Sequence, residues 1–172
     1  MHMEIHISGP SGSGKSFLGE RLKHEGFFVV DMDDFFQPGD GRWEKLIACG
    51  DDFALRSTLW HEMKNERFVH FRKQAGGNMI IWIGLTDHAA SPNEPFYDMH
   101  VEHKFFIEIS DVDLCRQYYT RLLTQKAEDV DWLHIPSSND VIATSNMLAT
   151  HIKHDYLVKR ADTIFSFVTL LK

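Results

Sequence analysis

The chain has 172 residues, of which 43% are hydrophobic and 25% charged, values typical of a globular domain rather than a disordered segment. Its formal net charge of −7 and isoelectric point near 5.8 argue against a protein whose main task is to bind nucleic acid, because that task needs a basic surface. No apolar run approaches the ~20 residues that span a bilayer. We therefore expect a single cytoplasmic domain over residues 1–172, monomeric or weakly homodimeric, with no membrane or nucleic-acid partner.

Strand-like and helix-like stretches alternate along the chain. Apolar runs predict five strands, at 3–7, 27–30, 79–83, 105–109 and 163–167. Helices are expected over about 15–24, 51–74, 112–126 and from Ser137 to about residue 160, with Asp51 or Asp52 capping the second and Gly76-Gly77 ending it. The alternation predicts a three-layer α/β fold, in which a five-stranded parallel sheet carries helices on both faces. The first strand should be central, with the 79–83 strand beside it.

A phosphate-binding pattern, G-x-x-x-x-G-K-S, lies between the first strand and the first helix. Its residues are Gly9, Pro10, Ser11, Gly12, Ser13, Gly14, Lys15 and Ser16. Glycines let the backbone curl so that successive N–H groups point inward, and the following helix presents its positive N-terminal end. In such a P-loop the lysine reaches the β and γ phosphates, and the next hydroxyl faces Mg²⁺. We therefore expect a P-loop NTPase fold that binds ATP or GTP together with Mg²⁺.

An acidic cluster, Asp31-Met32-Asp33-Asp34, follows the second strand. Ligands of open parallel sheets bind outside the carboxyl ends of the strands, so this cluster, the phosphate loop and the loop after Thr86 should converge on one site. A carboxylate there suits phosphoryl transfer, because it can orient and deprotonate an acceptor hydroxyl. Asp31 and Asp34 have an alternative role, in which each caps a turn or stays solvated.

The segment Asp33-Asp34-Phe35-Phe36-Gln37-Pro38 resembles the D-D-F-F-x-P segment of nicotinamide riboside kinases, and uridine kinase-like and nucleoside monophosphate kinases are related to them. The resemblance covers about the first forty residues well and the rest by architecture. It implies that Asp33 is the base toward the acceptor hydroxyl, with Asp34 beside it in substrate binding. Those kinases usually place an acidic residue before the glycine that ends the third strand, whereas this chain has Ile83-Gly84. Ser16, Asp33 and, through a water, Asp87 are therefore the candidates for Mg²⁺.

Arginines supply the remaining candidates. Arg116 and Arg121 resemble the arginines that small P-loop kinases carry on a mobile lid, which is expected here over about 117–138. Guanidinium groups stay charged and grip phosphate oxygens in pairs, although a solvated charged face is the alternative for both residues. An acceptor-binding insertion is expected over about 40–75. Within it Arg42 and Arg56 are substrate-binding candidates, and Arg56 is the candidate for the phosphate of a monophosphate acceptor.

The leading interpretation is an ATP-dependent phosphotransferase acting on a nucleoside, a nucleotide or a similar small metabolite. Its catalytic residues would be Lys15, Asp33, Arg116 and Arg121. The alternative is a nucleotide-binding regulator or degenerate kinase fold that binds ATP without transferring phosphate, because Ile83 stands where an acid is usual. A switch GTPase is disfavoured, since the chain contains neither D-x-x-G after the third strand nor N-K-x-D.

Overall fold

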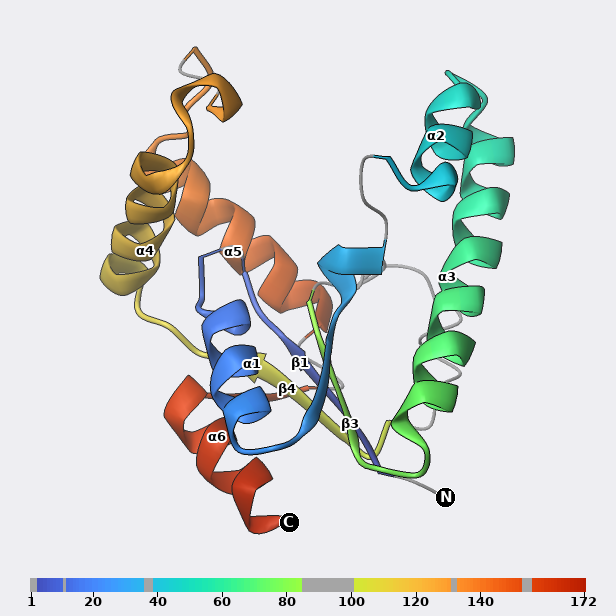
Figure 1. Cartoon of the computed structure of the whole chain (residues 1–172). Coiled ribbons are helices and arrows are strands. Elements are labelled where there is room, and N and C mark those ends of the chain that lie inside the picture. Colours follow the sequence, from blue (N-terminus) through green and yellow to red (C-terminus); the bar gives the residue numbers. More distant parts are fainter. Residues whose placement is uncertain (1–2, 11, 36–38, 85–100, 131–132, 153–155) are drawn as a thin grey trace.

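The computed structural model describes residues 3–10, 12–35, 39–84, 101–130, 133–152 and 156–172 (Figure 1). Five strands form one sheet in the order β2-β3-β1-β4-β5, and every neighbouring pair is parallel. The strands are β1 Glu4–Ser8, β2 Phe28–Asp31, β3 Ile80–Ile83, β4 His103–Ile107 and β5 Leu157–Lys159. The α-helices are α1 Lys15–His24, α2 Gly41–Ala48, α3 Phe53–Ala75, α4 Asp111–Thr124, α5 Ser138–Ile152 and α6 Ala161–Leu170, with 3₁₀ helices η1 Met32–Phe35 and η2 Ala127–Asp129. The predicted α/β fold is confirmed, with β1 central and β3 beside it.

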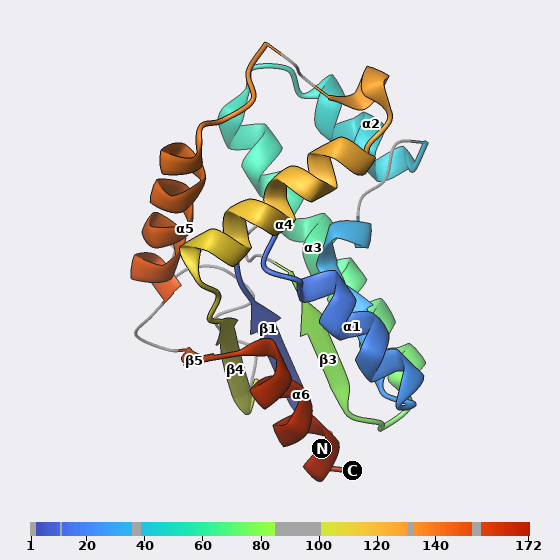
Figure 2. The same ribbon diagram turned by 90° about the vertical axis from the view of Figure 1, so that its left-hand side faces the viewer.

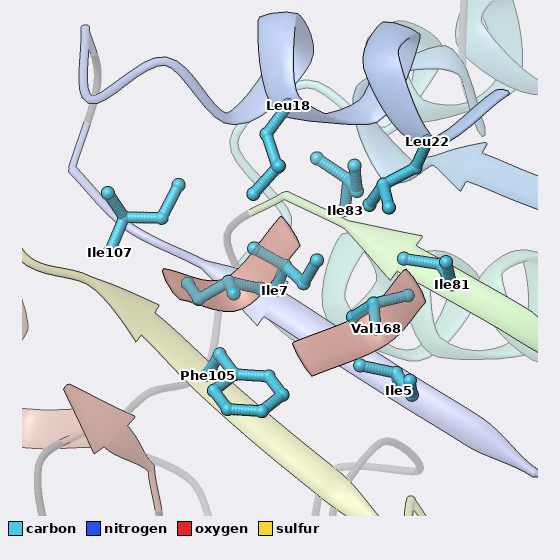
Figure 3. Packing of buried hydrophobic residues seen from close by; sticks show 10 residues of the cluster. Ile5, Ile7, Leu18, Leu22, Ile81, Ile83, Phe105, Ile107 and Val168 are labelled. Carbon is cyan, nitrogen blue, oxygen red and sulfur yellow. The ribbon is translucent and has the colours of Figure 1, made fainter. Parts of the chain in front are cut away.

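One face of the sheet packs against α1 and α6. Alternate residues of a strand point to opposite faces, so every second residue of the three central strands meets these helices. Leu18 and Leu22, one turn apart on α1, lie over this layer together with Val168 of α6, and the strand residues beneath them are Ile5, Ile7, Ile81, Ile83, Phe105 and Ile107 (Figure 3). Gly19 allows α1 to approach closely, because a Cβ at that position would lie 2.6 Å from Cδ1 of Ile83. This packing fixes the start of α1, and with it the phosphate loop, over the sheet.

The opposite face packs against α3 (Figure 1). Phe35 of η1 is buried there, with its ring centroid 5.1 Å from that of Phe68 and stacked 5.7 Å from that of Phe71. Trp82 of β3 lies 5.0 Å from Phe68, centroid to centroid, and completes the aromatic cluster. The turn that follows β2 is therefore held between the sheet and α3.

The C-terminal end of α3 is tied to the central strand by a buried ion pair. Glu4 at the start of β1 accepts hydrogen bonds from Nε and NH2 of Arg72, at 2.6 and 3.0 Å, and from Nε1 of Trp82 at 2.9 Å. Only 5% of Glu4 is exposed, and removing one partner of a buried pair typically costs about 3–5 kcal/mol. We call this contact the Glu4–Arg72 anchor.

Two expectations about the last third of the chain are wrong. Residues 163–167 belong to α6 rather than to a strand, and the fifth strand is β5, Leu157–Lys159. Ile164 and Val168, four residues apart, are both fully buried against the sheet, which is the spacing of a helix face, but Phe165 and Phe167 between them give the segment a strand-like appearance. The preceding helix accordingly ends at Ile152 instead of near residue 160.

The helix ends follow their sequence signals. Asp52 caps α3 by accepting from the Leu55 N–H at 3.0 Å, and Gly76 ends it in the left-handed conformation, with φ of 59°. Ser137 and Asp140 form a capping interaction at the start of α5. The short helix α2 was not predicted, and Asp40 caps it by accepting from the Arg42 N–H. Among the residues described, none of the helices has the length and apolar composition needed to cross a bilayer.

Candidate active site

The phosphate loop joins β1 to α1 and depends on its glycines. Gly12 and Gly14 have φ of 86° and 90°, in the left-handed region that favours glycine. A Cβ on Gly9 would lie 2.7 Å from Oγ of Ser13, and one on Gly12 would lie 3.2 Å from backbone atoms of Tyr118 in α4. The loop therefore curls tightly and passes directly against α4, which crosses the carboxyl ends of the strands (Figure 2). Ser11 lies outside the described residues.

A buried hydroxyl marks the inside of the loop. Oγ of Ser13 is buried and has no hydrogen-bond partner within the described part of the chain. Buried hydroxyls are normally paired, so this group is placed to donate to a ligand. Together with the glycine cradle and the N-terminal end of α1, it fits the phosphate oxygens of a nucleotide.

Lys15 folds back over the loop. Its Nζ donates to the carbonyl oxygens of Gly9 at 2.7 Å and Pro10 at 2.9 Å. Burial lowers the pKa of the Lys15 ammonium from 10.5 to about 8, and the charge of Asp33 opposes this shift. The ammonium is thus a desolvated cation in the loop, a state that anionic phosphate oxygens would stabilise.

The acidic cluster meets the loop through Asp31. Oδ2 of Asp31 accepts from the Ser16 hydroxyl at 3.3 Å, and its Oδ1 accepts from the Asp33 N–H at 3.0 Å. The turn-capping role predicted as an alternative for Asp31 is therefore present. Burial raises the pKa of Asp33, the negative charge of Asp31 raises it further, and the cations Lys15 and Arg121 oppose both effects. A carboxylate with a raised pKa is better matched to accepting a proton near neutral pH.

Oxygen ligands for Mg²⁺ gather at the same point. The Ser16 hydroxyl and the carboxylates of Asp31 and Asp33 are the hard donors that Mg²⁺ prefers. The structure, where it describes side chains, contains no group of three or more His, Cys, Asp or Glu suited to hold a metal ion. Mg²⁺ is usually held by one or two protein carboxylates together with waters and substrate phosphates. Asp87 lies outside the described residues, so its predicted role stays a prediction.

A cavity of about 420 Å³ opens over the phosphate loop. Three elements contribute to it, namely the loop with the start of α1, η1 and α4, through Gly12, Gly14, Lys15, Ser16, Phe17, Asp33, Gln117 and Arg121. A neighbouring cavity of about 470 Å³ shares Gly14, Phe17 and Gln117 with the first and extends to the turn before α6, at Arg160, Ala161 and Asp162. The cavity over the phosphate loop is therefore continuous with the second cavity, near the start of α6.

The other predicted residues fall in different places. Arg121 lines the phosphate cavity, whereas the side chain of Arg116 is 69% exposed and pairs with Asp113 at 3.1 Å, on a solvated face of α4. Arg56 lies on the exposed surface of α3, and Asp34 is exposed on η1. Arg42 pairs with Asp40 at the start of α2, at 3.3 Å. The structure thus brings Lys15, Ser16, Asp33 and Arg121 together.

Two functional features were not predicted from the sequence. Gln117 and Phe17 line both cavities, but no pattern marks them, because only the packing of α4 against the loop brings Gln117 there. Ile83, which stands where the kinases it resembles usually carry an acid, is 1% exposed and packs beneath α1. The third strand therefore ends in an apolar contact, and Asp31 supplies the carboxylate that touches Ser16.

The buried His6 of β1 connects three segments of the chain. Its Nε2 lies 3.0 Å from the carbonyl oxygen of Gly84, and its Nδ1 lies 2.5 Å from the hydroxyl of Tyr156. Burial lowers the pKa of His6 to about 3, so the ring is neutral. A neutral imidazole here links β1 to the residue after β3 and to the start of the β5 region.

Comparison with known proteins identifies the fold. No family model and no curated protein matches the chain. Among solved structures, the shikimate kinase of Bacteroides thetaiotaomicron is 16% identical, with a TM-score of 0.53 over 93% of this chain and 86% of that one. The shikimate kinase of Acinetobacter baumannii, solved with shikimate, is 12% identical, with a TM-score of 0.59 over 99% of this chain and 93% of that one. A Thermus thermophilus protein is 15% identical, with a TM-score of 0.60 over 99% of this chain and 96% of that one. The chain therefore shares its fold with these two shikimate kinases.

Proposed function

We propose that this protein is an ATP-dependent phosphotransferase that acts in the cytoplasm on a hydroxyl or phosphate of a nucleoside, a nucleotide or a similar small metabolite. One observation carries the proposal: a single cavity brings together Lys15, Asp33 and Arg121 from three separate elements. Phosphoryl transfer needs this combination, because cations must neutralise phosphate charge while a carboxylate orients the acceptor. The fold shared with two shikimate kinases supports the same class of reaction.

Each residue of the site has a separate role in the proposed phosphoryl transfer. Bound ATP and Mg²⁺ would supply the transferable phosphoryl group and neutralise its charge. Lys15 and Arg121 bind phosphate oxygens, the loop N–H groups and Ser13 hold the phosphates in place, and Asp31 orients the Ser16 hydroxyl. Asp33 accepts the proton of the acceptor hydroxyl. The second cavity, toward the start of α6, takes the nucleoside part of ATP. Residues 40–75 form the acceptor-binding arm, and residues 117–138 form the lid.

An acceptor panel tests the proposal. Purified protein with Mg²⁺ and ATP is incubated with nucleosides, nucleoside monophosphates, nicotinamide riboside and shikimate, and each phosphorylated product is detected by mass spectrometry. We expect one class of acceptor to be phosphorylated, and Lys15→Ala to lose that activity while keeping the melting temperature of the wild type. Tight ATP binding without any product across the panel would contradict the proposal.

That contrary result would favour the second candidate function, a nucleotide-binding regulator that does not transfer phosphate. The observation behind it is Ile83, which places a buried apolar side chain where kinases usually carry an acid. The two candidates also differ in Asp33→Asn. A regulator would bind ATP equally well with or without this carboxylate and would show no chemistry to lose.

A further inference from the structure

The two cavities beside the phosphate loop differ in charge. Among the described residues, the first is lined by two cations, Lys15 and Arg121, and by one carboxylate, Asp33. The second is lined by two cations and three carboxylates, together with two isoleucines, namely Arg21, Arg160, Glu108, Asp113, Asp162, Ile107 and Ile109. The excess of positive charge therefore lies in the first cavity. The second cavity suits the uncharged part of a ligand whose phosphates occupy the first.

The junction of the two cavities is marked by the residues that they share. In the described part of the chain these are Gly14, Phe17 and Gln117. A nucleotide with its terminal phosphate beside Asp33 and its nucleoside in the second cavity crosses the junction at its α-phosphate and ribose. Because Gly14 has no side chain, Phe17 and Gln117 supply the side chains that border this part of the ligand.

Phe17 exposes an apolar ring at the junction. It is the third residue of α1, directly after Lys15 and Ser16, and it is 71% exposed. The side chains by which α1 packs on the sheet are Leu18 and Leu22, so Phe17 is not part of that core. A single exposed apolar residue is common on protein surfaces, but this one lines both cavities. Its ring offers a flat apolar surface against which a nucleoside can pack.

Gln117 brings an amide to the same place from the other side. Helix α4, which carries it, passes over the phosphate loop (Figure 2). Its Oε1 would lie 3.6 Å from a Cβ on Gly14, so the end of the side chain reaches the start of α1. A carboxamide can donate to a phosphate oxygen and accept from a hydroxyl at the same time. Gln117 can therefore join an α-phosphate to the neighbouring ribose.

We infer that Phe17 and Gln117 select a ribonucleotide as the phosphate donor. Phe17 packs against the nucleoside, and Gln117 forms a hydrogen bond with a ribose hydroxyl. This inference rests on the proposed function and deepens it, since it names the residues that distinguish the donor from a bare polyphosphate and from a deoxyribonucleotide. The phosphates themselves are held by the loop and Lys15, so these two residues act on the sugar side alone.

The first arm of the test measures binding of ADP and of pyrophosphate, each with Mg²⁺, by isothermal titration. We expect Phe17→Ala to raise Kd for ADP about 10-fold, because apolar surface stays in water, and to leave Kd for pyrophosphate unchanged. Phe17→Tyr keeps the ring and should bind ADP like the wild type. Leu170→Ala, at an 84% exposed position of α6, is the matched control and should change neither constant. Unchanged ADP binding in Phe17→Ala, or an equal loss for pyrophosphate, overturns the inference.

The second arm compares ADP with 2′-deoxy-ADP and 3′-deoxy-ADP. We expect the wild type to bind ADP about 2- to 10-fold more tightly than one of the two deoxy analogues, which is the range for one neutral hydrogen bond. Gln117→Met keeps the length of the side chain without its hydrogen-bonding groups, so it should abolish this difference. Equal binding of all three nucleotides by the wild type, or a difference that survives in Gln117→Met, overturns the role of Gln117.

Neither arm requires an acceptor, so both results can be separated from those of the acceptor panel. A protein that phosphorylates nothing in the panel but shows both binding differences keeps the ribonucleotide site and refutes the proposed phosphotransferase. A protein that phosphorylates an acceptor, and whose ADP binding is the same in Phe17→Ala, refutes this inference alone. Failure of the wild type to bind ADP refutes both.

Discussion

The affinity for ATP should fall as pH rises above about 8, because of the state of Lys15 in the free protein. Burial lowers the pKa of its ammonium from 10.5 to about 8, so the free protein loses this charge as pH passes that value. Bound phosphates would return the pKa toward 10.5, since an opposite charge nearby favours the ionised form. ATP binding is then coupled to proton uptake above pH 8.

The size of the effect follows from the two pKa values. Between pH 7.5 and 9.5, the fraction of free protein with a charged Lys15 falls about 25-fold, whereas a group with the ordinary pKa loses about a tenth of its charge. The dissociation constant should therefore rise about 20-fold over this range, corresponding to about 1.8 kcal/mol. The terminal phosphate, whose second pKa is about 6, is already ionised throughout.

Isothermal titration with an ATP analogue that cannot be hydrolysed, at half-unit steps of pH and constant ionic strength, measures this change. Buffers of different ionisation enthalpy should reveal the proton uptake at pH 9. Lys15→Arg is the matched control, because a guanidinium stays charged and should bind with a flat pH profile. If the wild-type affinity is also flat to pH 9.5, the Lys15 ammonium is not desolvated as described and the reasoning fails.

Three further outcomes are expected. Asp33→Asn should reduce turnover about 10²- to 10⁴-fold while ATP affinity changes little, and Asp34→Asn should not; near-normal turnover in Asp33→Asn would place the base elsewhere. Gly12→Ala should lower the free energy of unfolding by about 1–2 kcal/mol in urea denaturation, because the residue has φ of 86° and its Cβ would lie 3.2 Å from the Tyr118 backbone. Gly12→Ala should also weaken ATP binding. An unchanged urea midpoint and an unchanged ATP affinity would show that α4 does not pack closely against the phosphate loop. Phe35→Ala should cost about 3–5 kcal/mol in the same assay, since it empties the aromatic cluster between β3 and α3. A loss below about 1 kcal/mol would mean that η1 is not held by this packing.

The parts of the site that could be predicted from the sequence are those with a local pattern. The phosphate loop is one continuous segment, and the strand before it and the helix after it appear where they were expected. The order of the central strands followed from the alternation of strands and helices. Asp33 was predicted as the base because it lies just after the second strand, at the edge where parallel strands end, and because its segment resembles that of nicotinamide riboside kinases; its place in the phosphate cavity agrees with this prediction.

The parts that were not predicted depend on contacts between distant segments. Gln117 reaches the phosphate cavity only because α4 crosses the loop, and Phe35 is buried only because α3 packs Phe68 and Phe71 against it. The spacing of charges along a helix does not show which of them face solvent, so the exposed position of Arg56 could not be predicted. At the C-terminus, Ile164 and Val168 suit a helix face as well as a strand, and only the sheet beneath them decides between the two.

The Glu4–Arg72 anchor gives the two ends of α3 different roles: the C-terminal end is held against the sheet, and the N-terminal turn is exposed. The anchor holds the end of the helix nearest Ala75 at the first residue of β1, at the opposite end of that strand from the phosphate loop. The first turn, by contrast, contributes little to the core, because Phe53 and Leu55 are 82% and 54% exposed. Substitutions at the exposed positions of α2 and of the first turn of α3 should therefore cost little stability, whereas Leu46 and Met63 belong to the core. Such a division would let acceptor preference diverge in evolution, and it makes the exposed positions within residues 41–62 the ones to randomise when a new acceptor is sought by directed evolution.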